Sequence, residues 1–170
     1  MSTLYILVGL PFSGKSTLLK TVSEYTNIIP ISFDELWKEL EQDSIEKEKL
    51  SFEYVSKIVD EKVTQLLKDE YSVMYDSLND TLDQRERLCN IAESSNASSQ
   101  IIYLDTPLEV VKMRRENNTK NMERHQVEDE NFEKAINKFI VPTEEENPMI
   151  FRYDENIVDW VKEKLSEYIK

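Results

Sequence analysis

The residues best suited to chemistry lie in one stretch near the start of the chain, Gly9-Leu10-Pro11-Phe12-Ser13-Gly14-Lys15-Ser16-Thr17. Its spacing fits the pattern G-x-x-x-x-G-K-[ST], a loop whose backbone N–H groups surround phosphates. The chain has 170 residues and only 2 glycines, and both stand in this stretch. Glycine suits such a loop because a Cβ hinders positive φ angles and close approach to an anion. The stretch therefore predicts a phosphate-binding P-loop.

Each polar position of this loop has an expected part in binding a nucleotide. The loop N–H groups and the N-terminus of the following helix should hold the β- and γ-phosphates. Lys15 is expected to bridge the β/γ oxygens, which makes it a candidate catalytic residue, and the Ser16 hydroxyl to reach Mg²⁺. The predicted nucleotide-binding residues of the loop are Gly9, Pro11, Ser13, Gly14, Lys15, Ser16 and Thr17.

The segments on either side of the loop support this prediction. Residues 4–8 are apolar and rich in strand formers, which is typical of a buried central strand. Residues 16–25 carry apolar side chains at helical spacing, namely Leu18, Leu19, Val22 and Tyr25. The order strand, loop, helix is the one that a P-loop requires.

Strands and helices alternate along the rest of the chain. Further strands are expected at residues 27–33, 71–75, 101–104 and 149–153. Helices are expected after Asp34, at about 47–68, at 81–93 (with Leu82, Leu88, Cys89 and Ala92 turned inward), at 107–116, at 128–139 and from about 157. The alternation predicts an α/β fold with a mostly parallel five-stranded sheet between helices on both faces, in a single domain over residues 1–170.

Two polar segments interrupt this pattern. Residues 39–48 are dense in charge and are expected to form a connection, and residues 117–125 are polar and expected to be mobile. We interpret residues 117–127 and 39–48 as lids on the one domain.

The charge of the chain limits its partners. The net charge is −13, and a strongly acidic surface repels nucleic-acid backbones and anionic membranes. No stretch is long and apolar enough to span a bilayer, and no signal peptide is evident. The single cysteine, Cys89, is expected to serve packing, so nothing indicates disulfides or zinc. We expect a cytoplasmic protein, monomeric or homodimeric, for which a nucleic-acid partner is disfavoured.

Missing motifs narrow the class of P-loop protein. The Asp-x-x-Gly switch and Asn-Lys-x-Asp base reader of GTPases are absent, as is the glycine-rich signature of ABC-type ATPases. Nucleoside-monophosphate kinases typically have Gly-Lys-Gly-Thr where this chain has Gly14-Lys15-Ser16-Thr17. The glycine cluster of shikimate-kinase-like proteins is also missing.

Several later segments complete a family pattern. They are Ser32-Phe33-Asp34, Val73-Met74-Tyr75-Asp76-Ser77-Leu78-Asn79 with Arg85 and Arg87 after it, Tyr103-Leu104-Asp105-Thr106-Pro107-Leu108-Glu109 followed by Arg114-Arg115, and Arg124-His125-Gln126-Val127. With the P-loop, they resemble the zeta-toxin-like and polynucleotide-kinase-like P-loop phosphotransferases of the AAA-domain small-kinase family. That group includes chloramphenicol phosphotransferase and an aminoacyl-tRNA kinase. The resemblance runs from about residue 3 to residue 154.

The resemblance implies a three-layer, mononucleotide-kinase-like fold, with ATP as phosphate donor and a hydroxyl group as acceptor. Asp34 resembles the family carboxylate that orients or deprotonates the acceptor hydroxyl. Its place after the second strand, at the ligand-binding edge of an α/β sheet, agrees with this role. Asp34 also fits a helix N-cap, and both roles can hold. Asp76 could hold the water shell of Mg²⁺, as could Asp105, and we prefer Asp76.

The resemblance also implies a lid at about residues 115–127. Arg124 would then close over the β- and γ-phosphates as a catalytic residue, or else be a solvated surface charge. Arg114 is expected to pack against adenine or its phosphates, and Arg115 to be its solvated neighbour. His125 is expected to be structural.

The acceptor is the least determined part. Residues 34–54 should form the far wall of its pocket, where Trp37, Phe52 and Tyr54 could stack on a ring or simply belong to the core. Phage-type polynucleotide kinases have an arginine one turn after the catalytic aspartate, and Trp37 stands there instead. The leading hypothesis is therefore an ATP- and Mg²⁺-dependent kinase acting on a small molecule. The alternatives are a 5′-hydroxyl polynucleotide or tRNA-directed kinase and a non-catalytic ATP-binding regulator.

Overall fold

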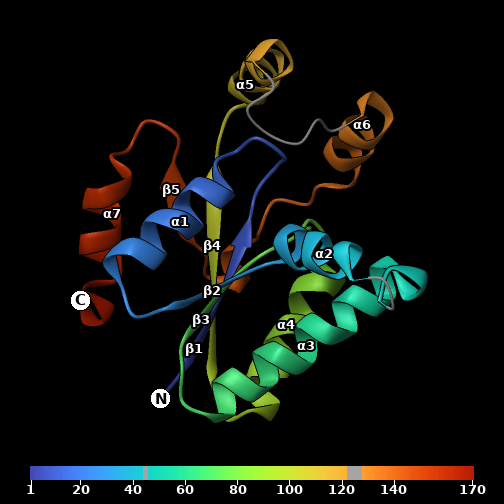
Figure 1. Cartoon of the computed structure of the whole chain (residues 1–170). Coiled ribbons are helices and arrows are strands. Elements are labelled where there is room, and N and C mark those ends of the chain that lie inside the picture. Colours follow the sequence, from blue (N-terminus) through green and yellow to red (C-terminus); the bar gives the residue numbers. More distant parts are fainter. Residues whose placement is uncertain (44–45, 122–127) are drawn as a thin grey trace.

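The chain folds around one five-stranded sheet, seen nearly edge-on in Figure 1. The computed structural model describes residues 1–43, 46–121 and 128–170, without the side chains of residues 119–121. The strands are β1 (Thr3–Val8), β2 (Ile29–Ser32), β3 (Val73–Asp76), β4 (Ser98–Asp105) and β5 (Met149–Arg152), in the order β2-β3-β1-β4-β5. The four pairings between these strands are parallel, so the predicted parallel five-stranded sheet is confirmed.

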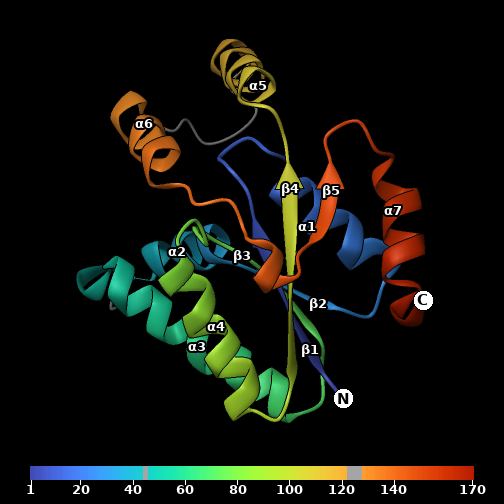
Figure 2. The ribbon, with the colours of Figure 1, turned by 180° about the vertical axis from the view of Figure 1, so that it is seen from behind.

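Helices cover both faces of the sheet, which confirms the three-layer prediction. One face carries α1 (Lys15–Tyr25) and α7 (Ile157–Lys164). The other carries α3 (Phe52–Lys68) and α4 (Leu82–Ser94), with α2 (Phe33–Gln42) directly after β2, as the reverse view in Figure 2 also shows. Beyond the carboxyl end of β4 stand α5 (Leu108–Asn121) and α6 (Asp129–Lys138). Short 3₁₀ turns occur at Lys47–Lys49, Glu144–Glu146 and Ser166–Tyr168.

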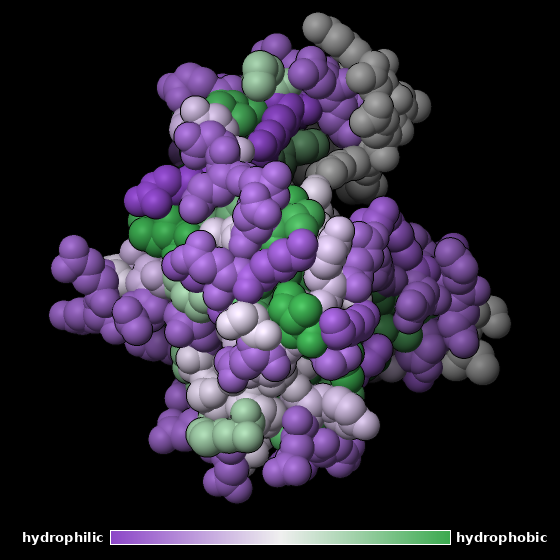
Figure 3. Space-filling view, turned by 90° about the vertical axis from the view of Figure 1, so that its left-hand side faces the viewer, coloured by the Kyte–Doolittle hydropathy of each residue, from purple (hydrophilic) through white to green (hydrophobic). Residues whose placement is uncertain are grey.

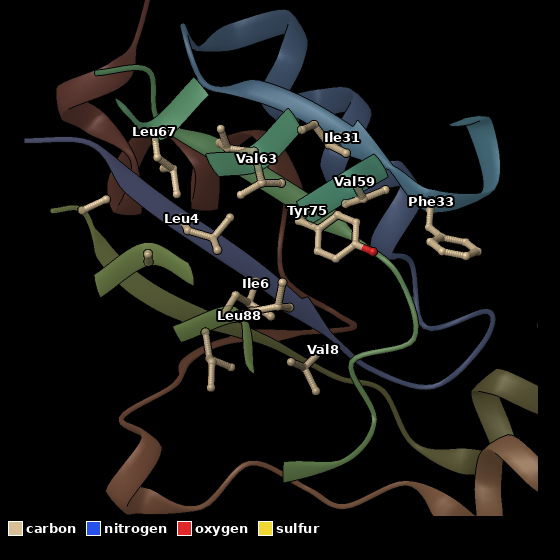
Figure 4. Close-up of a cluster of buried hydrophobic side chains, with 14 of the residues drawn as sticks. Leu4, Ile6, Val8, Ile31, Phe33, Val59, Val63, Leu67, Tyr75 and Leu88 are labelled. Carbon is tan, nitrogen blue, oxygen red and sulfur yellow. The ribbon is translucent and has the colours of Figure 1, made fainter. Parts of the chain in front are cut away.

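The central strand β1 is buried on both faces because each face has its own helical layer. Leu4, Ile6 and Val8 pack into a cluster with α3 and α4, part of which Figure 4 shows. Tyr5 and Leu7 point the other way, into a cluster with α1 and α7. Such burial explains why residues 4–8 are a continuous apolar run instead of alternating with polar residues.

Several boundaries differ from the sequence-based expectations. α2 continues to Gln42, into the predicted connection, and α3 begins only at Phe52 because Ser51 caps it, with its hydroxyl accepting from the N–H of Tyr54 at 3.1 Å. Strand β4 begins at Ser98 instead of residue 101. α5 reaches Asn121, so residues 117–121 of the polar segment expected to be mobile are helical. These errors concern element ends, where propensity is weakest against capping and packing.

The N-cap role of Asp34 was also predicted wrongly. β2 ends at Ser32, which pairs with Asp76 of β3, and the Ser32 hydroxyl accepts the N–H of Glu35 at 3.3 Å. Serine at this position satisfies a free N–H of the first helical turn, so it serves as the cap. Asp34 instead lies in the first turn of α2 and is exposed. Its negative charge there interacts favourably with the positive end of the helix dipole.

None of the helices in the described ranges is long and apolar enough to cross a membrane. The face in Figure 3 is mostly hydrophilic, with hydrophobic side chains in small scattered groups. This surface agrees with the high content of charged residues, 32% of the chain.

Candidate functional site

The glycine-bearing loop joins β1 to α1, and its shape requires both glycines. A Cβ on Gly9 would lie 2.6 Å from the Ser13 hydroxyl oxygen and 3.2 Å from the Cβ of Leu104 in β4, closer than these atoms can approach without movement. Gly14 has φ of +112°, which a residue with a side chain adopts only with strain. Gly9 is therefore required by close packing, and Gly14 by its backbone conformation.

The N-terminus of α1 is open to an anion. Its N-cap is Gly14, and no side chain caps the helix there. The first N–H groups of a helix lack partners within the helix and lie at the positive end of its dipole. This end of α1 therefore has the properties of a phosphate site.

Two side chains from outside the loop hold its backbone. The Thr106 hydroxyl donates to the carbonyl oxygen of Ser13 at 3.0 Å. Arg114 of α5 donates through Nη1 to the same oxygen at 2.9 Å and to that of Phe12 at 3.2 Å. In a trans peptide the N–H points away from the C=O, so this anchoring turns the Gly14 N–H to the opposite side. The structure thus places Arg114 on the loop backbone, and its predicted contact with the nucleotide stays a prediction.

Phe12 connects the loop to α6. It has a φ of +65°, an uncommon value for a bulky residue, and its ring lies edge-on to that of Phe132 at 6.2 Å between centroids. The Arg115 guanidinium covers the Phe132 ring at 4.4 Å and forms an ion pair with Asp129. The expectation that Arg115 is merely solvated was therefore wrong, because its guanidinium contacts both the Phe132 ring and Asp129.

Lys15 lies within the loop, where its ammonium donates to the carbonyl oxygens of Gly9 at 2.8 Å and Leu10 at 3.1 Å. Burial lowers the pKa of Lys15, and the negative charges of Asp76, Asp34 and Asp80 oppose that shift. Three carboxylates from two segments therefore act on one ammonium group. Of the predicted site residues, Asp34 and Asp76 are thus both within electrostatic reach of Lys15.

Ser16 and Asp76 form the candidate metal site. The Ser16 hydroxyl donates to Oδ2 of Asp76 at 2.9 Å, across the gap between α1 and β3. Burial raises the pKa of Asp76, while the charge of Lys15 and the Ser16 hydrogen bond lower it. A hydroxyl beside a carboxylate is an oxygen donor set that suits Mg²⁺. Asp105, the alternative, is exposed at the end of β4, and no hydrogen bond to Ser16 is found for it in the described ranges.

The acceptor side begins at Asp34, two residues beyond the Ser32–Asp76 pair. Phe33 is buried there, with the Trp37 ring at 6.1 Å and the Phe52 ring at 5.0 Å between centroids. Trp37 is half-buried in this cluster, whereas 49% of Phe52 stays exposed. Tyr54 points elsewhere, since its hydroxyl donates to Glu46.

The lid prediction can be followed only in part. Arg124 and His125 lie outside the described residues, so the predicted lid arginine stays a prediction. The described ends, α5 and α6, face one another across a groove of about 830 Å³. It is lined by Leu108, Lys112, Arg115, Glu116, Asp129, Phe132, Glu133, Ile136 and Asn137.

Sequence reasoning gave no role to Phe12, Thr106, Asn79 or Arg85, all of which support the site. Asn79 is buried and donates through Nδ2 to the carbonyl oxygen of Leu7 at 2.9 Å. Arg85 is 1% exposed although Leu82, predicted to face inward, is 40% exposed. The signal for Arg85 was available, because it lies three residues before Leu88 on the inward stripe of α4.

Comparison with known proteins agrees with this geometry. Residues 4–142 match the family model AAA_33, described as an AAA domain. Kti12 from Chaetomium thermophilum, solved in complex with ADP-AlF3, is 20% identical with a TM-score of 0.73, over 98% of this chain and 99% of that one. The APS kinase CysC from Mycobacterium tuberculosis, solved with AMPPNP and APS, is 14% identical with a TM-score of 0.68, over 97% and 96%.

A putative kinase from Chloroflexus aurantiacus is 16% identical with a TM-score of 0.70, over 98% of this chain and 97% of that one. At these identities the solved structures show a shared fold, that of P-loop kinases. The match to the family model covers most of the chain, so this protein belongs to the AAA domain family AAA_33.

Proposed function

We propose that this protein is an ATP-binding kinase that transfers the γ-phosphate of ATP to a hydroxyl group of a small molecule. The observation that carries the proposal is the hydrogen bond of 2.9 Å between Ser16 and Asp76, directly beside Lys15. A P-loop lysine, a metal-binding hydroxyl and a strand-end carboxylate are the parts from which phosphoryl transfer is built.

The donor side supplies positioning and positive charge. To reach the β- and γ-phosphates, the Lys15 ammonium exchanges the carbonyl oxygens of Gly9 and Leu10 for phosphate oxygens. The N-terminus of α1 and the Gly14 N–H add donors that require no movement. Because the loop is already held by Thr106 and Arg114, little reorganisation accompanies binding.

Ser16 and Asp76 would hold Mg²⁺, with Asp76 in its ionised form. When bound there, the ion offsets negative charge on the phosphates. Its binding would also favour ionisation of Asp76, whose pKa burial raises.

The acceptor side supplies the base. In the proposed reaction the acceptor oxygen bonds to the γ-phosphorus, the bond from that phosphorus to the bridging oxygen breaks, and ADP leaves. Asp34 takes the proton of the acceptor hydroxyl. Its exposure in the first turn of α2 gives an acceptor access to it, and its charge acts on both Lys15 and Asp76. Arg124 would add positive charge at the transferring group.

Four observations favour a small acceptor. The net charge of −13 disfavours a polyanion, and Trp37 stands where phage-type polynucleotide kinases have an arginine. Structures of the same fold include an APS kinase, a sugar kinase and a gluconokinase. Phe52 offers an exposed ring near Asp34 on which a ring-bearing acceptor could stack.

The test follows the γ-phosphate. Purified protein is incubated with Mg²⁺ and γ-labelled ATP in a small-metabolite extract supplemented with 5′-hydroxyl RNA and DNA, and the label is fractionated. We expect label in a new small molecule, and none with Lys15→Ala protein. Label on the oligonucleotide, with a steep salt dependence of binding, would instead support a polynucleotide kinase. Label that stays in ATP despite measured binding would support a non-catalytic regulator.

A further inference from the structure

Arg85 of α4 is a charged residue in the interior. Its side chain is 1% exposed, and its partner Glu146, in the turn Glu144–Glu146, is 13% exposed. The two form a bidentate pair, with Nε to Oε1 at 2.6 Å and Nη2 to Oε2 at 3.0 Å. A buried pair of this kind contributes little net stability relative to apolar residues of the same size. Its retention here therefore calls for another explanation.

The remaining donor of this arginine ties two segments together. Nη1 donates to the carbonyl oxygen of Ile140 at 3.0 Å and to that of Asn79 at 3.3 Å. The N–H of Ile140 in turn donates to the carbonyl oxygen of Asp80 at 2.8 Å. The loop at residues 77–80, which follows β3, is thus held at two successive carbonyls.

Asn79 extends this chain of bonds to the P-loop strand. Its Nδ2 donates to the carbonyl oxygen of Leu7, two residues before Gly9, and the side chain is buried. The connected groups therefore run from Glu146 through Arg85 and Asn79 to the end of β1. The loop so anchored follows Asp76, the last residue of β3, and ends in Asp80, and both carboxylates act on Lys15.

We propose that Arg85 is a positioning residue, which sets the 77–80 loop against the end of β1 through Asn79 and so places Asp76 beside Ser16. The inference rests on the proposed function, because it assigns this placement to the binding of Mg²⁺–ATP. Outer groups that orient a metal-binding residue affect metal affinity without touching the metal. Arg85 acts in this way from the far side of the loop.

The test uses the double variant Arg85→Met/Glu146→Gln. Methionine fills the buried space without charge, and glutamine retains an oxygen for the Thr143 N–H, which Glu146 now accepts at 2.8 Å. Two quantities are measured on the full chain: hydrogen exchange of residues 77–80 without nucleotide, and the ratio of ATP affinity in Mg²⁺ to that in EDTA. We expect faster exchange and a fall of about 10-fold or more in the ratio, with ATP affinity in EDTA unchanged.

A second variant keeps the test valid if the first fails to fold. Asn79→Ala removes the side-chain hydrogen bond to Leu7, changes neither Arg85 nor Glu146, and should lower the Mg²⁺ ratio in the same way. The matched control is Arg87→Met/Asp60→Asn. Arg87 lies two residues after Arg85 in α4 and forms an ion pair with Asp60 of α3. The control should change neither quantity.

The outcomes separate the two proposals. Unchanged exchange at residues 77–80, or faster exchange with an unchanged Mg²⁺ ratio, would overturn the positioning role while leaving the kinase proposal standing. If the wild-type protein binds no ATP, the proposed function fails, and the exchange measurement alone decides whether Arg85 anchors the loop.

Discussion

On the nucleotide side of the site, the loop at residues 9–14 is fixed by partners on three elements: α5 and the start of the segment after β4 bind its carbonyls, and β4 packs against Gly9. On the acceptor side, Asp34 and Phe52 project from the first turns of α2 and α3, and both are exposed. The nucleotide side is therefore built from backbone groups that other elements hold in place. The acceptor side is built from exposed side chains.

This difference separates two kinds of information in the chain. A phosphate recognised by backbone N–H groups needs glycines at fixed spacing, which a motif records. An acceptor recognised by exposed side chains needs only a suitable surface, which many sequences can supply. The phosphate-binding part of the site can therefore be recognised from a motif, whereas the acceptor has to be found by experiment.

The largest effect should come from the nucleotide side. Lys15→Met removes the ammonium that would meet the β/γ oxygens, so phosphoryl transfer should fall by about 100-fold or more. The control is Lys20→Met, an exposed lysine on the same helix, which should leave transfer and ATP affinity unchanged. ATP affinity and turnover within threefold of wild type in Lys15→Met would contradict the assignment of the loop.

Asp34→Asn should affect the acceptor side of the site without affecting nucleotide binding. Without a base for the acceptor hydroxyl, turnover should fall by about 100-fold, while ATP affinity stays close to that of the wild type. Calorimetric titration with ATP and a label-transfer assay measure the two quantities. Glu35→Gln, the neighbouring exposed carboxylate, serves as the control, and an equal loss of turnover in both variants would argue against a specific role for Asp34.

Glu146 makes the stability of the Arg85 network, which holds the 77–80 loop, sensitive to acid. The hydrogen bond from Arg85 lowers the pKa of Glu146 below its ordinary value of 4.5, despite partial burial. The contribution of ionised Glu146 to the free energy of unfolding is therefore fully present above the pKa of this carboxyl in the unfolded chain. It is lost as the pH falls through the lower pKa of the folded protein. Glu146→Gln should flatten the dependence of unfolding free energy on pH below about pH 4.5, measured by urea denaturation. An unchanged slope would mean that this carboxylate is not held as described.

The smallest effect on stability should come from the acceptor side. Phe52→Ala removes a half-exposed ring that packs on Phe33, so unfolding free energy should fall by only about 1 kcal/mol or less. The KM for a ring-bearing acceptor should rise by between about 2- and 10-fold, with that for ATP unchanged. Tyr54→Phe, whose hydroxyl is directed to Glu46, is the control and should change neither KM.

The sequence predicted the parts of the fold that depend on apolar periodicity. The five strands and the helices between them follow from runs such as residues 4–8, and the meeting of Lys15, Ser16 and Asp76 follows from their places at strand and helix ends. The catalytic role of Asp34 stays a prediction, and the capping role that it was expected to share belongs to Ser32. Capping depends on a single hydroxyl, which propensity along a segment does not resolve.

The supporting contacts could not be predicted in the same way. Phe12 meets Phe132 and Arg85 meets Glu146 across long stretches of sequence, so no local pattern pairs them. The place of Arg85 on the inward stripe of α4 indicates burial, but the partners that make burial of its charge possible come from distant segments. Residues outside the described ranges, Arg124 among them, stay predictions.

The strand order also bears on how the protein is made. Strand β1 is made before both of its neighbours in the sheet, since Leu4 pairs with Val73 on one side and Ser99 on the other. At about 5–20 residues per second, the ribosome needs several seconds after making β1 to supply both neighbours. Until β3 has been made, the apolar strand before the P-loop has neither of its two neighbouring strands to pair with. Thr106 and Arg114, which hold the backbone of the P-loop, are made later still, so the loop gains its anchors only after synthesis has reached α5.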